Sequence, residues 1–507
     1  MKSQLLQGGR LAALVLACGN DASRGQPSLA VRDATVSDAG GAPEAVAQAE
    51  AVTDIAGTWL GTLPVPPVPL RLVLNVERDA AGGWSGTADS PDQGSFGLPI
   101  TSIDVTGSHV VVHLDGIGLV ITAELSSDGQ TLTGTLQQGG ASLPLSLARQ
   151  AAPLEYQRPQ DPVPPFPYDA LEVTFPSAEP GVTLAGTLLS PSGPGPFPTV
   201  VLITGSGAQN RNEELLNHRP FLVLADALAR ANVAVLRYDD RGVGGSTGDF
   251  AAATSLSFAQ DVRGALGYLR AQTRVPVGSI GLIGHSEGGL IAPLVADGDA
   301  GLAFLVLLAG PAVDGATIII AQGRAIAAVQ GATPVELDAN EAVQRALFAC
   351  FGARGAAGAA DAGPDAAATG EMGAVSDAAL DACLRQVLTG AGLSGAELEQ
   401  NLRQFESPWM RFFATYDPAP ALRRLRVPVL ALNGSLDLQV PASLNLPILR
   451  EALAEAGNER SLVVELPGLN HLFQHALTGA PSEYGAISET MAPELLSQIT
   501  DWIARLP

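Results

Sequence analysis

The residues with the clearest capacity for chemistry are a serine in the segment Gly284-His-Ser-Glu-Gly-Gly289 and two polar residues far downstream. Ser286 follows the apolar run Ile280–Gly284 and precedes a helix-like run, Leu290–Ala296. A strand-to-helix turn that admits only small flanking residues forces the serine hydroxyl out at the carboxyl edge of a sheet. The helix N-terminus also stabilises negative charge that develops there. The pattern therefore predicts a nucleophile at Ser286 rather than a structural turn.

A serine hydroxyl needs a base, and the base needs a carboxylate that orients it. In sheets with this turn the chain order is serine, acid, histidine. Asp437 directly follows the apolar run Val427–Asn433, and His471 follows Leu462–Leu466. Loops at the carboxyl ends of parallel strands meet at one edge of the sheet. We therefore expect Ser286, Asp437 and His471 to form a catalytic triad.

Other residues compete for these roles. His475 is an alternative base, and Glu465 and Asp417 are alternative acids, although neither acid lies in a loop just past a strand. His475 is also four residues after His471, which is the spacing of a helical zinc pair. The glutamate of that zinc motif and further ligands are missing nearby, so we expect no metal site.

Acyl transfer also requires two N–H donors aimed at the oxyanion. We expect one from the amide of Glu287, the residue after the nucleophile. The other is expected in the loop Gly205–Arg211, which follows the apolar strand Thr199–Thr204. Ser206 is the first choice and Gly207 the second, because glycines allow the backbone to approach a substrate closely.

Two further polar features are predicted to be structural. The segment Asp239-Asp240-Arg241 ends a strand, and we expect a turn held by an internal Asp–Arg interaction. His218 and His285 are expected to be structural or adjacent to substrate, since His285 cannot easily reach the hydroxyl of Ser286.

Composition excludes several other classes of chemistry. The chain has 507 residues and a formal net charge of −23, which disfavours nucleic acid as a partner. Its only lysine is Lys2. A P-loop, a pyridoxal enzyme and a Ser–Lys dyad each need a lysine in the site. We therefore expect no phosphate cradle, no pyridoxal cofactor and no Ser–Lys dyad.

The second part of the chain alternates apolar strands with amphipathic helices. This rhythm predicts an α/β fold over 170–507, with a mostly parallel sheet and helices on both faces. It is interrupted at about 312–420 by a helical insertion that we expect to form a cap, including the Ala/Gly/Asp-rich tract Gly352–Asp377. The elements expected before the insertion are strands at Thr199–Thr204 and Val233–Tyr238 and helices at Pro220–Ala231 and Asp261–Gln272.

The first part of the chain has a different texture. Residues 1–18 have the form of a secretory signal peptide whose last residue, Cys18, is a candidate for lipidation. A flexible linker is expected at 19–52, an all-β domain (a small barrel or sandwich) at 53–150, and a proline-rich connector at 151–169. These features predict an exported protein of a bacterial cell envelope or periplasm, with a membrane contact only through the lipid anchor.

Two cysteines remain beside Cys18, namely Cys350 and Cys383. An even pair in an exported chain is compatible with a disulfide. Two small buried thiols are the alternative, and the sequence leaves both open.

Several of these segments together resemble the bacterial α/β-hydrolases of the EstD-like serine esterase group, which carry an N-terminal β domain. The resemblance spans about Gly57 to Pro507. It rests on Gly205–Arg211, Pro220–Asp226, Leu236–Gly242, Gly284–Gly289, Gly434–Asp437 and, in the β domain, Ser90–Gly94. The resemblance implies an α/β-hydrolase fold and serine carboxylesterase activity on short acyl esters, a small-molecule substrate, with no cofactor.

Two other functions compete with an esterase. A serine peptidase of the prolyl-oligopeptidase type shares the triad order, but about 95 residues are too few for its usual N-terminal propeller. A non-catalytic cell-surface binding protein is the third hypothesis, and the filled triad positions argue against it. Oligomeric state and natural substrate do not follow from the sequence.

Overall fold

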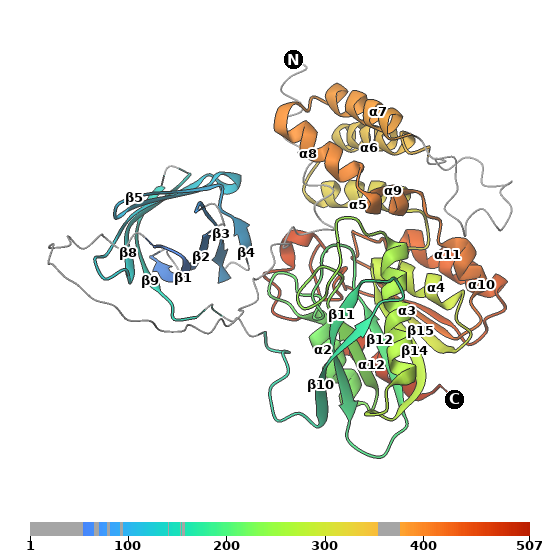
Figure 1. Ribbon diagram of the computed structural model, residues 1–507. Helices are drawn as coiled ribbons and strands as arrows, with labels where there is room; N and C mark the ends of the chain where they lie inside the picture. Colours follow the sequence, from blue (N-terminus) through green and yellow to red (C-terminus); the bar gives the residue numbers. More distant parts are fainter. Residues whose placement is uncertain are drawn as a thin grey trace, which may run out of the picture. The chain divides into compact units, whose positions relative to one another are not determined.

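The computed structural model (Figure 1) describes residues 54–64, 70–78, 82–91, 95–139, 141–152, 154, 158–352 and 376–506. The expected signal peptide with Cys18, the linker and nearly all of the tract Gly352–Asp377 lie outside these ranges, as do residues 92–94 of the Ser90–Gly94 segment. Pro159–Glu483 and Glu489–Pro507 form one compact unit. The described residues up to Arg158 form another with Tyr484–Ser488.

The smaller unit is an antiparallel β-sheet of nine strands, as its alternating sequence predicts. The spatial order is β4-β3-β2-β1-β9-β8-β7-β6-β5. Alternate side chains from β1–β3 and β5–β9 share one hydrophobic core, and the sheet curls around this core (Figure 1). The strands are β1 (Gly57–Leu63), β2 (Leu70–Arg78), β3 (Trp84–Ser90), β4 (Ser95–Pro99), β5 (Ser102–Thr106), β6 (His109–Leu114), β7 (Leu119–Leu125), β8 (Thr131–Gln138) and β9 (Ala141–Arg149).

The larger unit is built on a mixed sheet of eight strands in the order β10-β11-β13-β12-β14-β15-β16-β17. The run from β13 to β17 is parallel, and β10 and β11 are antiparallel at one edge. The mostly parallel sheet confirms the prediction. Its strands are β10 (Tyr168–Pro176), β11 (Thr183–Pro191), β12 (Phe197–Ile203), β13 (Ala234–Tyr238), β14 (Val277–His285), β15 (Leu302–Leu308), β16 (Val429–Gly434) and β17 (Leu462–Leu466).

Helices cover both faces of this sheet, because its central strands are apolar on both sides. In β12, Val200 and Leu202 pack with α2 (Pro220–Arg230) and α12 (Pro493–Ala504). The intervening residues of β12 face the opposite layer, which is made by α3 (Ser255–Ala271), α4 (Glu287–Ala296) and α11 (Ala442–Glu455). The alternation of side chains along each strand therefore places one hydrophobic core on each face.

One helix boundary differs from its prediction. We expected a helix at Asp261–Gln272, whereas α3 begins six residues earlier, at Ser255. Thr254 caps this helix, because its side chain accepts a hydrogen bond from the backbone N–H of Ser257. The cap satisfies an N–H that the first helical turn would otherwise leave free.

The segment between β15 and β16 is helical where the sequence predicts an insertion. Figure 1 shows α5–α9 grouped at one end of the sheet. In the described part of the chain, no helix combines the length and apolarity that a membrane span requires. The inserted helices are α5 (Gly315–Val329), α6 (Pro334–Ala349), α7 (Asp377–Gly390), α8 (Gly395–Phe405) and α9 (Pro408–Thr415), and α10 (Ala419–Arg424) leads back to the sheet.

A disulfide joins two of the inserted helices. Cys350 at the end of α6 is bonded to Cys383 in α7, with their Cα atoms 5.7 Å apart and a sequence separation of 33. Of the two alternatives that the sequence leaves open, the structure supports the disulfide. The bond closes the chain that connects α6 to α7.

Removing this cross-link is expected to destabilise the protein. A double substitution, Cys350→Ala with Cys383→Ala, should lower the free energy of unfolding by about 3–4 kcal/mol, because the unfolded chain regains the freedom that the closed loop removes. Urea unfolding with and without reductant measures this. Reductant should destabilise the native protein and leave the double variant unchanged; equal sensitivity of both would contradict the prediction.

Candidate active site

Ser286 lies at a sharp turn between β14 and α4. Its backbone has φ 51° and ψ −117°, a conformation that residues other than glycine rarely adopt. The backbone N–H of Ser286 donates to the carbonyl of Leu308 in the neighbouring strand at 2.8 Å. Strain of this kind persists only where the surrounding structure imposes it, and it is concentrated at functional sites.

The glycines around the serine are required by close packing. A Cβ on Gly284 would lie 2.0 Å from the carbonyl oxygen of Gly288. A Cβ on Gly288 would lie 2.1 Å from the carbonyl oxygen of Ile203, at the end of β12. The small residues of the sequence motif therefore allow α4 to start directly against the sheet, as predicted.

Substituting one of these glycines tests this packing. Gly288→Ala should lower the free energy of unfolding by about 1–3 kcal/mol, because the added methyl group must displace the backbone of β12. Gly267→Ala is the matched control: a Cβ there meets nothing within 4 Å on α3, and the change should stabilise the helix by about 0.5–1 kcal/mol. Thermal unfolding of both variants compares the two. A Gly288→Ala protein as stable as the control would refute the close approach.

Asp437 and His471 meet at the same edge of the sheet. Nδ1 of His471 and Oδ2 of Asp437 are 2.9 Å apart, and both side chains are buried. The other carboxylate oxygen, Oδ1, accepts the backbone N–H groups of Gln439 at 2.9 Å and Val440 at 2.8 Å. The carboxylate is thus fixed by its own loop and orients the imidazole ring.

The competing residues lie in other environments. His475 is 55% exposed, and its two ring nitrogens are each 2.9 Å from a glutamate, Glu489 and Glu494. Asp417 accepts the backbone N–H of Ala419 at the start of α10, at 2.9 Å. Glu465 is exposed on β17. Of the candidate acids, Asp437 is the one that the structure places on His471.

The loop Gly205–Arg211, which is predicted to supply an oxyanion donor, is held by hydrogen bonds to two carboxylates. The backbone N–H of Gln209 donates to Asp240 at 2.9 Å, and that of Arg211 donates to Asp239 at 2.9 Å. Gly207 has φ +98°, the region that favours glycine. A Cβ on Gly205 would lie 3.2 Å from Cβ of Ser286, so this loop passes directly beside the serine.

The prediction of an internal Asp–Arg interaction in the segment 239–241 is wrong. Asp239 pairs with Arg211, at 2.8 Å, and Arg241 pairs with Asp261 on α3, also at 2.8 Å. Asp240 is buried and accepts the hydroxyl of Thr204 at 2.8 Å, and burial raises the pKa of its carboxyl well above the ordinary value. Long side chains pair across elements here, because β13 brings this segment beside the loop after β12.

Glu287 follows the serine and is buried. One oxygen, Oε1, accepts the hydroxyl of Ser255 at 2.5 Å and the indole N–H of Trp409 at 2.8 Å. Burial raises the pKa of Glu287 to about 6, although both hydrogen bonds oppose the rise. Trp409 belongs to α9, so this carboxyl joins the inserted helices to the start of α4.

The raised pKa of Glu287 predicts how its contribution to the free energy of unfolding changes with pH. Because the folded state holds this proton more tightly than the unfolded state, the group favours folding below about pH 4.5, and this contribution is lost as the pH rises through about 6. The loss amounts to about 2 kcal/mol. Denaturant unfolding of the native protein and Glu287→Gln at pH 4.5 and 7 should show the variant gaining relative stability at pH 7. A pH-independent difference would exclude the raised pKa.

Sequence reasoning missed Glu213 in this site. Its carboxylate oxygen Oε1 accepts the backbone N–H of Gly205 at 2.7 Å and lies 2.9 Å from Nδ1 of His285. The second ring nitrogen of His285, Nε2, is 3.0 Å from the carbonyl oxygen of His471. An acidic residue in the loop before α2 has no motif that marks it. His218, in contrast, is buried beside Thr490 and Gln474, as expected for a structural histidine.

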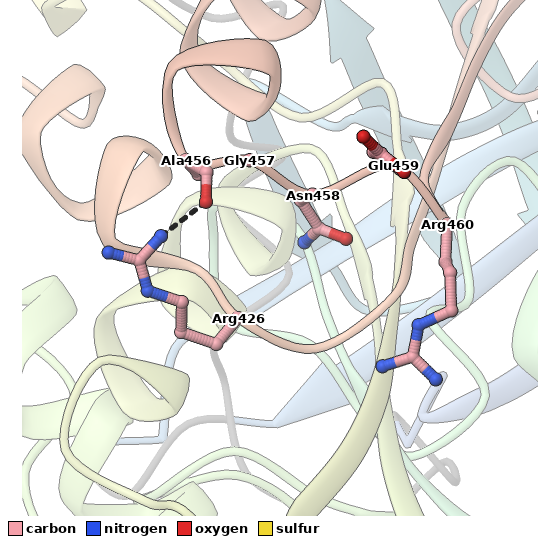
Figure 2. A pocket seen from close by; sticks show the side chains of 6 residues that line it. All are labelled: Arg426, Ala456, Gly457, Asn458, Glu459 and Arg460. Carbon is pink, nitrogen blue, oxygen red and sulfur yellow. Dashed lines mark hydrogen bonds between the residues drawn. The ribbon is translucent and has the colours of Figure 1, made fainter.

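A separate hollow of about 250 Å³ lies away from these residues. It is lined by Arg426 and residues 456–460, at the amino ends of β16 and β17 and thus at the edge of the sheet opposite Ser286. Figure 2 shows Arg426 bonded to the carbonyl of Ala456, and the guanidinium of Arg460 does not face that of Arg426. Within the described ranges, no group of three or more His, Cys, Asp or Glu residues is placed to hold a metal ion.

Comparison with known proteins bears on this arrangement. Residues 200–483, more than half of the chain, match the model of the alpha/beta hydrolase family. The chain is 29% identical to esterase EstD of Thermotoga maritima over 149 residues, which is 29% of this chain and 34% of that relative. It therefore spans about a third of the length of that esterase.

Similar solved structures include an esterase of Pyrococcus furiosus, Pf2001, with 15% identity and a TM-score of 0.39, covering 67% of this chain and 92% of that one. Est1E of Butyrivibrio proteoclasticus, bound to ferulic acid, has 17% identity and a TM-score of 0.36, covering 64% of this chain and 96% of that one.

Proposed function

This chain belongs to the alpha/beta hydrolase family, and we propose that it is a serine carboxylesterase that acts on short-chain acyl esters. The observation that carries the proposal is the hydrogen bond between His471 and Asp437 at the sheet edge where the strained turn presents Ser286. A triad activates a serine hydroxyl for acyl transfer through a buried carboxylate that orients an imidazole, and here the serine turn and this pair lie at the same edge of the sheet. The similarity to esterase EstD supports an ester as the substrate.

The reaction follows from the roles of these groups. Oγ of Ser286 attacks the ester carbonyl carbon, and Nε2 of His471 accepts the hydroxyl proton. Asp437 holds the Nδ1–H and stabilises the imidazolium. The tetrahedral intermediate then expels the alcohol, which takes the proton from His471 and leaves an acyl-enzyme. Water, deprotonated by His471, attacks the acyl group, and Ser286 leaves with the returned proton.

The amides of Glu287 and Ser206 are proposed to bind the oxyanion, with Gly207 as the second choice for the latter donor. Glu287 begins α4, so its N–H is one of the free donors of a helix N-terminus. The amide of Gly205 is bonded to Glu213, so Gly205 is not proposed as a donor. Such donors contribute most when they are fixed before the reaction.

The inserted helices α5–α9 are proposed to act as a cap that selects the substrate. The hydrogen bond from Trp409 to Glu287 supports this role, because it holds α9 next to the residue that follows the nucleophile. The rings of Trp409 and Phe413 are stacked, with centroids 4.8 Å apart, and both pack into the hydrophobic core, which fixes α9 in place.

Export with a lipid anchor at Cys18 remains our proposal for the location. The Cys350–Cys383 disulfide supports it, since disulfides persist in oxidising compartments outside the cytosol. Mass spectrometry of the protein purified from membranes would identify a lipidated Cys18.

An assay of two substrate classes tests the proposed function. Hydrolysis of p-nitrophenyl esters of increasing chain length, beside a peptidyl anilide, should show a preference for short esters. A preference for the anilide would instead support a peptidase of the prolyl-oligopeptidase type. A fluorophosphonate probe should label Ser286; failure to label it would favour a non-catalytic binding protein.

A further inference from the structure

Glu213 and His285 form a buried pair that the proposed reaction does not use directly. Both side chains are at least nine-tenths buried, with exposed fractions of 5% and 7%. The Glu213 backbone has φ 52°, a strained conformation for a residue that carries a side chain. In the described part of the chain, Oε2 of Glu213 is buried without a hydrogen-bond partner. A buried carboxylate with a free oxygen costs stability, so a role is needed to explain it.

The hydrogen bonds of His285 determine its protonation. Nδ1 faces Oε1 of Glu213, which already accepts the N–H of Gly205, and Nε2 faces the carbonyl oxygen of His471. A neutral imidazole has one N–H and one lone pair. Either neutral tautomer would therefore point a lone pair at an oxygen lone pair. When Glu213 is ionised, only an imidazolium satisfies both contacts.

The charges around His285 favour the same state. Burial lowers the pKa of His285, but the charge and hydrogen bond of Glu213, the carbonyl of His471 and the charge of Asp437 together raise it above its ordinary value. The His471 ring also faces it, with ring centroids 4.8 Å apart, and Phe473 packs edge-on at 6.2 Å. A protonated His285 is thus opposed by burial and balanced by two carboxylates.

We propose that Glu213 and His285 are positioning residues, a charged pair that fastens the oxyanion loop and the loop of the catalytic base to the nucleophile turn. Glu213 holds the loop at Gly205, His285 precedes Ser286 in the chain, and its Nε2–H holds the main chain of His471. One continuous set of three hydrogen bonds therefore links the three loops that must keep their spacing during acyl transfer. The inference rests on the proposed function of Ser286 and His471.

Glu213→Gln tests the role of the negative charge, because glutamine has nearly the same size and shape as glutamate but is neutral. A glutamine oxygen can still accept the N–H of Gly205 and a neutral Nδ1–H of His285, but Nε2 then loses its proton and its bond to His471. We expect kcat for a p-nitrophenyl ester to fall about 10–100-fold with little change in KM. The reason is that the base His471 is displaced, whereas binding of the substrate in the ground state is unaffected. His285→Phe should lower kcat by a similar factor. The kcat of the double variant should be no lower than that of the less active single variant, because both changes break the same set of hydrogen bonds.

Glu489→Gln is the matched control, since it makes the same change in the exposed His475–Glu489 pair and should leave kcat unchanged. Nitrogen-15 NMR of the histidines at pH 7.5 gives a readout that does not depend on activity. Both ring nitrogens of His285 should carry protons in the native protein, and one should be bare in Glu213→Gln.

Unchanged kcat in folded Glu213→Gln, additive losses in the double variant, or a bare ring nitrogen on His285 in the native protein would each overturn the inference. A native protein that hydrolyses no ester would instead refute the proposed function, and the NMR pattern would still decide whether the charged pair exists.

Discussion

Ser286→Ala should lower kcat for an activated ester by about 10⁴–10⁶-fold, the largest effect expected of any single substitution in this protein. The change removes the attacking oxygen and leaves every other group in place. Alanine also has a Cβ, so the strained turn at φ 51° is no harder to form than with serine. The midpoint of thermal unfolding should therefore stay close to that of the native protein.

The measurement pairs p-nitrophenyl acetate hydrolysis with labelling by a fluorophosphonate probe. Ser192→Ala is the matched control, since Ser192 is exposed and its hydroxyl donates to the carbonyl of Pro167, at 2.9 Å. The control should retain both activity and labelling. Hydrolysis and labelling that survive in folded Ser286→Ala would place the nucleophile elsewhere.

Asp437→Asn should lower kcat by about 10³–10⁴-fold. The amide oxygen of asparagine can keep the bonds from the N–H groups of Gln439 and Val440, which Oδ1 of Asp437 now accepts. The amide NH₂ then faces His471, so it stabilises the tautomer whose Nδ1 has no proton. In that tautomer Nε2 carries the proton and cannot accept one from Ser286.

The two other candidate acids supply controls for this effect. Asp417→Asn and Glu465→Gln make the same charge change at residues that do not contact His471 in the structure. Both should keep kcat within a factor of about two of the native value, as surface changes away from a site usually do. If Asp437→Asn kept full activity while one of the others lost it, the assignment of the acid would be wrong.

The strands of the two sheets could be predicted because the sequence patterns that indicate them are local. The apolar runs Val427–Asn433 and Leu462–Leu466 correspond to the parallel strands β16 and β17, of which β16 is buried, and the order of the strands brought Asp437 and His471 to one edge. The nine-stranded sheet followed in the same way from short alternating runs between turns. These inferences required a periodicity or a turn signal within about ten residues.

The supporting contacts of the site could not be predicted, because they join residues that are distant in the chain. Glu213 and His285 are 72 residues apart, and Trp409 and Glu287 are 122 residues apart. The internal Asp–Arg interaction in the segment 239–241 was wrongly predicted for the same reason, because Asp239 pairs with Arg211 of another loop. A buried polar group pairs with whichever partner the packing brings to it.

By itself, the amino-acid sequence determined the order of strands and helices along the chain. It also determined the strained turn at Ser286, because the glycines on both sides are small enough to permit it. Those features depend on neighbours in the chain and on the steric size of each residue. Only the tertiary structure decided that Glu213 pairs with His285, which helix reaches Glu287, and that Cys350 pairs with Cys383. Such pairings are set by distances across the packed layers, which no local pattern in the chain records.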